Sequence, residues 1–527
     1  MWHTVRVSKN QKKGKAKKQP SEPKQVAIID LGSNTSKLVL FEYREGHSYR
    51  EIDEIRQLVR LAEGMGKAEV LRVDAAERAM RALTTFDAYC KAAGVEEICI
   101  TATSAVREAT NGENFLEEVK SRTDLEPRIL SDQEEAYYEA VAAANSLPFD
   151  DAYIFDIGGG SAEFSKIEKR EMTQAHSYTI GALRMTEQFL TSDPPKKKEV
   201  KALVKHVREL LGDFEGCAEE TPLIGMGGTL RNLAKIQIDR DDHSGELVHH
   251  YVLSKDDLED ITEDLLDMEV EDIRDDVSGL KSDRADIITA GAVTALEVLK
   301  ITGASGYVIC DQGLREGLFY GYLLDRDPPL FESADELRDF SVRNLERLYY
   351  DNEPHNDHVE KLSLDLFDQL SELHGYGGDE RRLLAAGARL HDIGMAIAYD
   401  DHEEHGLYLM MNRPLPGFSQ REQALIALLV RYHRDDDSPE DEGLDDLLED
   451  GDMMRLGKLA ALLRLAEYLE RSKAQNVKEV RCHVGQGYVQ IEALSDTDVS
   501  IEVQEANLRS ELFAEAYEVE VEIVQRF

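Results

Sequence analysis

The sequence predicts a multidomain protein with an α/β first half, an all-α domain after it, and a small α/β segment at the end. A chain of 527 residues is long enough for three or four domains, each with its own core. From Gln25 onward, short apolar runs alternate with stretches of helical periodicity, which is typical of mixed α/β domains. After Pro328 and Pro329 the pattern changes to long helical stretches, which indicates a domain boundary.

The first α/β unit, expected over residues 25–146, opens with two strands joined by a polar turn that contains glycine, in VAIIDLGSNTSKLVLFEY. EIRQLVRLAEG is a further strand candidate. An amphipathic helix follows in VDAAERAMRALTTFDAYCKAAG, and then a strand in EEICITAT. This order predicts a sheet with helical cover.

The second unit, expected over residues 147–328, repeats that opening in AYIFDIGGGSAEFSKIEK. Its later parts are a strand, glycine turn and helix in PLIGMGGTLRNLAK, and a closing segment, GYVICDQGLREGLFYGYLLD. An apolar run, an aspartate, glycine and small polar residues occur at residues 30–35 and again at 156–161. The recurrence predicts two related halves that face each other.

Long helical patterns predict an all-α domain over residues 329–474. The last segment, residues 475–527, contains VRCHVGQGYVQIEAL and LRSELFAEAYEVEVEIV, which predict a hairpin, a helix and a strand. We therefore expect a small α/β appendage at the end of the chain.

The charge balance is strongly acidic, with 62 Lys and Arg against 105 Asp and Glu and a net charge of −43. This charge disfavours non-specific binding of nucleic acid or of anionic membranes by the folded body, and it predicts adaptation to a salt-rich cytosol.

No apolar run of about 18 residues and no secretory signal occurs, so a cytoplasmic protein without a membrane partner is expected. Five scattered cysteines predict neither a disulfide framework nor a thiolate zinc site.

Residues 1–24 have the opposite charge, with eight basic side chains against Glu22 alone. Such a segment predicts a disordered basic arm. Three interpretations stay open: contact with RNA or polyphosphate, a solvated extension, or a wrongly assigned start.

The repeated glycine turns suit phosphate, because consecutive backbone N–H groups without side chains can face phosphate oxygens. Asp30 and Asp156, at the strand ends, are candidate ligands of Mg²⁺, and the strand alternation makes Glu163 a third acid. A single turn of this kind would be interpreted as a simple hairpin, but two of them together with GMGGTLRN favour phosphate. The candidate phosphate-binding residues are Gly32, Ser33, Asn34, Thr35, Gly158, Gly159, Gly160, Ser161, Gly227, Gly228 and Thr229.

A polyanionic substrate requires local positive charge in so acidic a protein. Lys37, Arg107, Arg184 and Arg231 follow or flank the motifs and are candidate phosphate contacts. For Lys37 and Arg184 an ordinary ion pair is an equal alternative. Arg315 is expected to brace the fold through a buried ion pair instead.

Seven motifs in order, DLGSNTSKLVLFE, ITATSAVREATNGENFLEEV, ILSDQEEA, FDIGGGSAEF, IGALRMTE, IGMGGTLRNLAK and CDQGLREGL, resemble the exopolyphosphatase and guanosine pentaphosphate phosphohydrolase family over about residues 25–325. The resemblance implies two ribonuclease-H-like domains of the actin-like ATPase and sugar-kinase fold with a cleft between them. It also implies hydrolysis of a terminal phosphoanhydride with Mg²⁺ or Mn²⁺, and a homodimer.

By the same resemblance, Glu135 in DQEEA matches the catalytic base of the family, and Asp156 and Glu163 match the acids that organise metal and water. A carboxylate near the start of a helix can accept the proton of an attacking water. The neighbouring Glu134 is the natural misassignment.

The helical domain resembles the HD phosphohydrolase pattern of a metal site, with Glu467 where that pattern has aspartate. Imidazole and carboxylate together suit a divalent transition metal, whereas a lone histidine on a helix is usually a core or surface residue. The candidate ligands are His358, His391, Asp392 and Glu467, with His402, His405 and His433 for a second metal.

The leading hypothesis is an exopolyphosphatase that releases terminal orthophosphate from inorganic polyphosphate. The alternatives are a guanosine pentaphosphate phosphohydrolase that makes ppGpp, an actin-like ATP-dependent kinase, a non-catalytic phosphate or alarmone sensor, and an enzyme whose hydrolysis takes place at the HD site. The sequence does not separate the first two.

Overall fold

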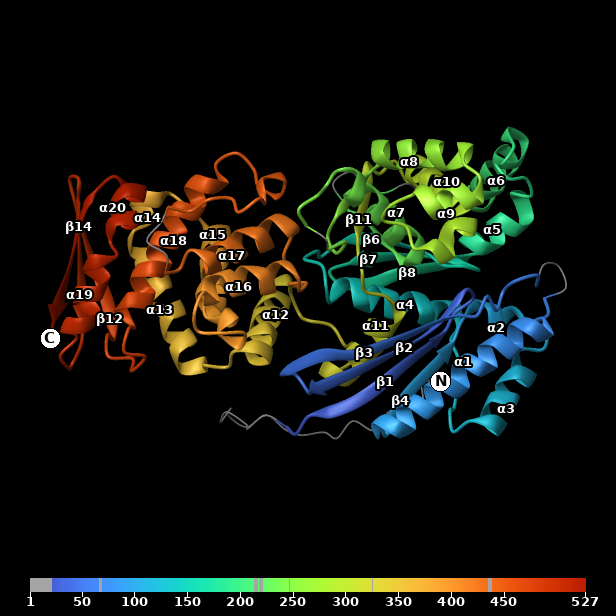
Figure 1. Ribbon diagram of the computed structural model, residues 1–527, viewed down its shortest axis with the longest axis horizontal. Coiled ribbons are helices and arrows are strands. Elements are labelled where there is room, and N and C mark those ends of the chain that lie inside the picture. The colour runs from blue at the N-terminus through green and yellow to red at the C-terminus, as the bar shows by residue number, and fades with distance from the viewer. Residues whose placement is uncertain are drawn as a thin grey trace.

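The computed structural model describes residues 21–65, 69–212, 217, 221–245, 247–324, 326–434 and 438–527. The chain forms two lobes at one end of the molecule and a helical domain with a small sheet at the other end (Figure 1). Nearly all of the basic arm expected over residues 1–24 lies outside the described residues. No helix in the described ranges is both long and apolar enough to span a membrane.

The first lobe contains a five-stranded sheet in the order β3-β2-β1-β4-β5. β1 is central and almost entirely buried, pairs antiparallel with β2 and parallel with β4, and so ends at the same edge as β4. The strands are β1 (Lys24–Leu31), β2 (Thr35–Arg44), β3 (Ser48–Leu58), β4 (Glu97–Ala102) and β5 (Arg128–Ile129). The helices are α1 (Val73–Ala93), α2 (Ser104–Glu108), α3 (Gly112–Arg122) and α4 (Asp132–Ala144).

The second lobe repeats this arrangement in a six-stranded sheet of order β10-β11-β9-β6-β7-β8. β6 pairs antiparallel with β7 and parallel with β9, as β1 pairs with β2 and β4. The strands are β6 (Ala152–Ile157), β7 (Ala162–Glu168), β8 (Glu171–Tyr178), β9 (Leu223–Met226), β10 (Val252–Ser254) and β11 (Gly306–Ile309). The helices are α5 (Ala182–Phe189), α6 (Lys197–Leu210), α7 (Gly227–Arg240), α8 (Lys255–Asp267), α9 (Val270–Asp276), α10 (Ala285–Thr302) and α11 (Leu314–Leu324).

The two lobes are interlocked by α4 and α11, which lie between the sheets (Figure 1). α4 follows the strands of the first lobe but packs on β7 and β8 of the second. α11 follows the strands of the second lobe but packs on β1 and β2 of the first, where Phe319 stacks on Phe41 with ring centroids 4.0 Å apart. The structural lobes therefore exchange helices across the boundary expected near residue 146.

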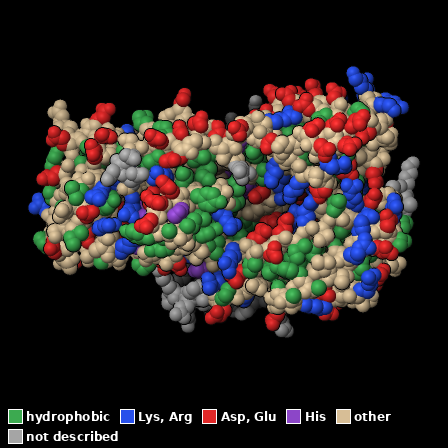
Figure 2. Space-filling model, in the orientation of Figure 1, with side chains coloured by type: hydrophobic (Ala, Val, Ile, Leu, Met, Phe, Trp, Pro, Cys, Tyr) green, Lys and Arg blue, Asp and Glu red, His purple; other side chains and the backbone are tan. Residues whose placement is uncertain are grey.

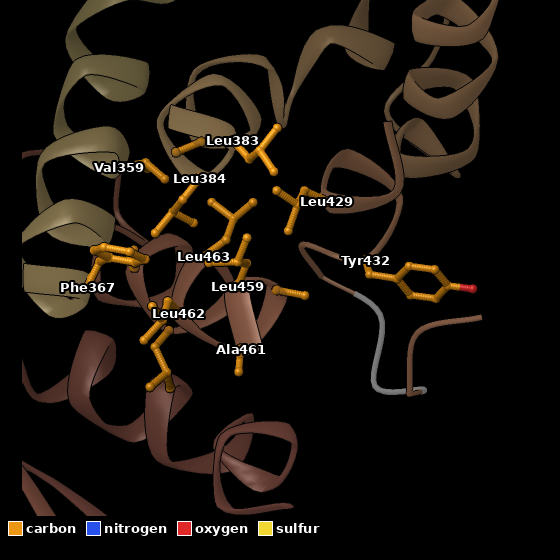
Figure 3. Close-up of a cluster of buried hydrophobic side chains, with 14 of the residues drawn as sticks. Val359, Phe367, Leu383, Leu384, Leu429, Tyr432, Leu459, Ala461, Leu462 and Leu463 are labelled. Carbon is orange, nitrogen blue, oxygen red and sulfur yellow. The ribbon is translucent and has the colours of Figure 1, made fainter. Parts of the chain in front are cut away.

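The helical domain is built around α18 (Asp452–Leu469), whose residues are buried on nearly every side. Leu459, Leu462 and Leu463 project from it into the apolar core drawn in Figure 3. The surrounding helices are α12 (Ala334–Tyr349), α13 (Glu353–Gln369), α14 (Ser371–His374), α15 (Gly378–Leu390), α16 (His402–Met411) and α17 (Gln420–Arg431).

The final segment forms a three-stranded sheet with two helices, one helix more than the sequence predicts. β13 pairs antiparallel with β12 and parallel with β14. Its apolar side chains belong to the same core as those of α18, so the segment is continuous with the helical domain. The elements are β12 (Glu479–Gly485), β13 (Tyr488–Leu494), α19 (Ser500–Leu508), α20 (Glu511–Tyr517) and β14 (Glu520–Arg526).

The core around α18 allows a test of how the helical domain is stabilised. Leu463→Ala should destabilise this domain by about 2–5 kcal/mol, because the side chain is fully buried and its removal leaves a cavity. Scanning calorimetry should show a lower melting temperature. Leu508→Ala, at a position that is 62% exposed, is the control and should change stability by less than about 0.5 kcal/mol. Equal effects of the two substitutions would contradict this assignment of the core.

Candidate active site

The two glycine turns lie against each other at the boundary of the lobes. A Cβ atom added to Gly159 would lie 3.0 Å from Cβ of Asn34, and one added to Gly160 would lie 2.9 Å from Oγ of Ser33. Ser33 and Ser104 also share a hydrogen bond of 2.8 Å between their hydroxyls. The turns thus face each other, as the repeated pattern predicts, and side chains on these glycines would close the space between them.

A third glycine turn, between β9 and α7, completes the site. Gly227 has φ of +83°, and a Cβ there would lie 2.2 Å from Oδ1 of Asp156. A Cβ on Gly228 would lie 2.0 Å from the guanidinium of Arg284. Glycine is needed at both positions because the backbone runs directly against charged side chains.

These turns enclose a cavity of about 130 Å³. Charged side chains of both signs gather around the hollow between the lobes (Figure 2). Most of the residues selected from the sequence line the cavity, namely Asp30, Gly32, Ser33, Asn34, Thr35, Lys37, Glu135, Asp156, Gly158, Gly159, Gly160, Ser161, Glu163, Gly227, Gly228 and Arg231.

Three candidate phosphate-binding residues from the sequence do not line the cavity. Thr229 is buried within α7. Arg184 donates a hydrogen bond to the carbonyl of Gly160 and pairs with Glu108 at 2.5 Å, so it braces the second turn through the ion pair considered as its alternative. Arg107 donates to Oε2 of Glu135 at 2.9 Å and to the carbonyl of Leu130, and therefore contacts the expected base directly.

The capping geometry of α4 separates the two adjacent glutamates. Ser131 is the N-cap, and its backbone N–H donates to the carboxylate of Glu134, which completes a capping box and also binds Arg128. Glu135 lies on the other side of the helix, is 7% exposed and lines the cavity. Only Glu135 of this pair is therefore in a position to act on a bound molecule.

The acids of the cavity hold protons more tightly than usual. Burial raises the pKa of Glu135 to about 7, although Arg107 lowers it in part. Burial likewise raises the pKa of Asp30 and of Asp156 to about 6, and it places the pKa of Glu163 well above its ordinary value. Of these groups, Glu135 has a pKa near neutral pH, so it can exchange a proton there.

Four basic side chains, Lys37, Arg231, Arg284 and Arg315, line the same cavity, and Lys37 is the cross-strand neighbour of Asp30. Burial, followed by the charge of Arg315, lowers the pKa of Lys37 to about 7. Arg315 does pair with Glu54 and Glu316, at 3.8 and 3.6 Å, but it also faces the cavity, which the sequence analysis did not expect. Arg284 precedes α10, outside every motif, so no signal in the sequence marks it.

A second group of ionisable residues lies inside the helical domain. One oxygen or nitrogen from each of His355, His391 and Glu467 forms a buried triad, with separations of 3.2–3.3 Å. Asp392, His402 and His433 form a second buried triad, in which the two imidazole Nε2 atoms are 3.2 Å apart.

The two triads differ from the expected ligand set at two positions. His355, and not His358, lies beside His391. His358 instead donates a hydrogen bond to the carbonyl of Val477 at 2.7 Å. His405 likewise lies outside the second triad, to which α16 contributes His402. Histidines three residues apart lie on the same face of a helix, so spacing alone does not say which of the two reaches the triad.

Three of the imidazoles are oriented for metal binding. Nδ1–H of His391, of His402 and of His433 donates to the carbonyl three residues earlier, at 2.7–2.9 Å. The Nε2 lone pairs therefore face one another across the triads, an arrangement that a cation between them would stabilise. Both Oε2 of Glu467 and Nδ1 of His355 lack a hydrogen-bond partner among the described residues.

Two lobes whose sheets share the order of five strands, with β10 added in the second, surround a cavity of glycine turns and carboxylates and define an enzyme of the actin-like fold class. The chain belongs to the Ppx/GppA phosphatase family: the family's sequence model matches residues 39–326, and its domain III model matches residues 337–512. The resemblance found from the motifs is thereby confirmed. Members of this family hydrolyse phosphoanhydride bonds, and this chain is such a phosphatase.

The chain is similar to proteins with different names within this family. It is 27% identical over 428 residues to the guanosine-5'-triphosphate,3'-diphosphate pyrophosphatase of Pseudoalteromonas atlantica, which is 79% of this chain and 80% of that protein. An exopolyphosphatase structure from Cytophaga hutchinsonii shares the fold at 23% identity and a TM-score of 0.52, over 59% of this chain and 100% of that one. The Aquifex aeolicus family member is 27% identical, with a TM-score of 0.49, over 56% and 97%.

The raised pKa of Glu135 predicts how the pH affects stability. The folded pKa of about 7 exceeds the ordinary value of 4.5, so the contribution of this carboxyl to stability is present below pH 4.5 and is lost as the pH rises through 7. Without divalent cations, Glu135→Gln should therefore gain about 2 kcal/mol of stability relative to the unchanged protein between pH 5 and pH 8. Urea unfolding in EDTA at the two pH values measures this gain. A pH-independent difference would contradict the burial of this group.

Proposed function

We propose that the protein is an exopolyphosphatase that removes terminal orthophosphate from inorganic polyphosphate in the cavity between the lobes. The observation that carries this proposal is the contact between the turns at residues 32–34 and 158–161, with Glu135 directed into the same cavity. Two adjacent glycine turns suit two neighbouring phosphoryl groups of one chain, although the N–H of Gly158 donates to the carbonyl of Ser161 at 3.0 Å and is not available to them.

The residues present fit a hard divalent cation, Mg²⁺ or Mn²⁺. Asp30, Asp156 and Glu163 offer carboxylate oxygens, and Oδ1 of Asp30 is buried with no hydrogen-bond partner among the described residues. A bound cation would neutralise charge on the phosphoryl oxygens during transfer.

The proposed reaction assigns a role to the turns, to the basic side chains and to Glu135. The N–H groups of the turns, with Lys37, Arg231 and Arg284, hold the terminal phosphoryl group and the next one. Glu135, fixed through Oε2 by Arg107, accepts a proton from water as the water oxygen bonds to the terminal phosphorus. The bridging P–O bond breaks, the shortened chain keeps the bridging oxygen as an anion, and the proton passes from Glu135 to solvent.

Guanosine pentaphosphate is the alternative substrate, because the same attack on a terminal phosphate would produce ppGpp. The relative from Pseudoalteromonas atlantica is named for a guanosine nucleotide. However, none of the described residues that line the cavity is aromatic, so no ring is in place there to stack on guanine. A guanine base would therefore have to bind outside this cavity of about 130 Å³.

Exchanging Glu135 tests the proposed base. Glu135→Gln should lower phosphate release from long-chain polyphosphate with Mg²⁺ by at least about 100-fold, since the amide cannot accept the proton of water. Glu134→Gln is the matched control and should retain activity, because Glu134 caps the helix outside the cavity. Equal loss in both variants would argue against the assignment. Parallel assays with guanosine pentaphosphate would decide between the two substrates.

We propose in addition that the helical domain binds two divalent transition-metal ions. The supporting observations are the two buried triads, their fixed imidazole orientations, and the position of Asp392 between them. Oδ1 of Asp392 is 3.3 Å from Nε2 of His402, and its Oδ2 is 3.6 Å from Nε2 of His391. Mixed imidazole and carboxylate ligands suit Mn²⁺, Fe²⁺ or Zn²⁺.

Metal analysis tests this second site. Protein loaded with Zn²⁺ or Mn²⁺ and then dialysed should retain about two ions per chain, as measured by inductively coupled plasma mass spectrometry. His391→Ala and His402→Ala should each lower that content, because each removes an Nε2 ligand. His358→Ala and His405→Ala are the matched controls, because these histidines lie on the same helices, α13 and α16, as triad histidines. Both variants should keep the metal content of the unchanged protein. Retention of metal by all four variants would exclude the site.

A further inference from the structure

Helix α4 carries a second buried glutamate, Glu139, one turn after Glu135. Residues four apart on a helix lie on the same face, and both side chains line the cavity between the lobes. Glu139 is only 5% exposed, although no motif of the sequence analysis selected it. Its place in the cavity therefore needs a physical explanation.

Glu139 has no partner of opposite charge. Within the described part of the chain, no residue donates a hydrogen bond to its carboxylate or forms an ion pair with it. Glu135, by contrast, accepts from Arg107, and Glu163 accepts from Ser177 at 3.1 Å. Burying an unpaired carboxylate costs several kcal/mol unless a proton or a cation neutralises it.

The neighbours of Glu139 add to this cost. Asp156, Glu163, Glu135 and Asp30 all act on Glu139 as like charges. A leucine at the position would avoid the repulsion and fill the space equally well. The acid is thus unfavourable for the fold unless something positive occupies the centre of the group.

The geometry fits one ion. One carboxylate oxygen from each of Glu135, Glu139 and Glu163 lies within 4.8 Å of the other two. Two oxygens bound to one Mg²⁺ are at most about 4.2 Å apart, since each bond is about 2.1 Å long. Small side-chain rotations would therefore bring one oxygen each of Glu139 and Glu163 onto a single cation, with Glu135 beside it.

We propose that Glu139 is a ligand of the divalent cation in the cleft, which it binds together with Glu163. This inference rests on the proposed phosphatase site and extends the ligand set expected from the sequence by one carboxylate. Glu135 stays available to the water, because Arg107 holds its Oε2. The site binds a hard cation such as Mg²⁺, since every donor is a carboxylate oxygen.

Calorimetric titration with Mg²⁺ tests the proposal without relying on turnover. Glu139→Gln keeps the shape of the side chain but removes its charge, and should weaken Mg²⁺ binding by at least about tenfold. It should also reduce the rise in melting temperature that Mg²⁺ produces. Glu134→Gln, on the same helix but outside the cavity, is the matched control and should bind Mg²⁺ as the unchanged protein does. Mg²⁺ is a suitable probe because the imidazole-rich triads of the helical domain prefer softer metals.

The alternative is that a proton, and not a metal ion, neutralises the carboxylate of Glu139, and the same experiment identifies this case. If Glu139 is a neutral acid, Glu139→Gln will bind Mg²⁺ with unchanged affinity, and the proposal is overturned. Glu139→Leu provides a second variant in case the amide disturbs the fold. It should be folded by circular dichroism and bind Mg²⁺ as weakly as Glu139→Gln.

Phosphate release from polyphosphate, measured on the same preparations, separates the two proposals. If Glu139→Gln weakens Mg²⁺ binding but the unchanged protein releases no phosphate, polyphosphate is not the substrate and Glu139 is still a metal ligand. If the unchanged protein releases phosphate and Glu139→Gln binds Mg²⁺ normally, the proposed function stands and Glu139 is not a metal ligand.

Discussion

The structure depends on the neutralisation of carboxylates that are buried together in the cavity between the lobes. Asp30, Glu135, Asp156 and Glu163 converge on one small cavity in a protein whose net charge is −43. Burial, together with the charges of neighbouring acids, raises the pKa values of Asp30 and Glu135, and the proposed polyphosphate substrate would bring further negative charge. The basic side chains that line the same cavity offset part of this charge, and the proposed metal ion would offset more. The pKa of about 7 places Glu135, the proposed base, near the pH at which it can exchange a proton.

The glycine turns allow this concentration of charge because they contribute N–H groups without side-chain volume. Gly159 and Gly160 bring the two lobes within van der Waals distance at the cavity, and Gly227 lets the backbone pass beside Asp156. The lobes supply equivalent parts, a strand end with an acid and a turn, so the site has an approximate internal symmetry. The glutamates do not follow that symmetry, since Glu135 comes from α4 whereas Glu163 of the second lobe lies on β7. In the proposed reaction the turns hold the phosphoryl groups and Glu135 alone accepts the proton of the water.

Local patterns in the sequence predicted the parts of the site that follow directly from a strand end. The two turns, Asp30, Asp156 and Glu163 were found because alternation and glycine spacing are local properties. Arg284 and Glu139 were missed because their role depends on how α10 and α4 pack, which no short motif encodes. His358 was chosen where His355 lies inward, since the rotation of α13 is set by its contacts with α15 and α18. The sequence therefore showed which segments contribute to the two sites. Tertiary packing determines which side chain of each segment points into the site.

The helix exchange between the lobes has a consequence for how such a protein can evolve. Because α4 rests on the second sheet and α11 on the first, neither lobe has a complete core of its own. A gene divided between them would encode two polypeptides, each with an uncovered apolar surface and each missing part of the catalytic apparatus. The two lobes are thus inherited as a single unit. The helical portion has a core of its own, but Phe331 and Leu337 near its start pack with the first lobe, so a break near residue 330 would also expose apolar side chains of that lobe.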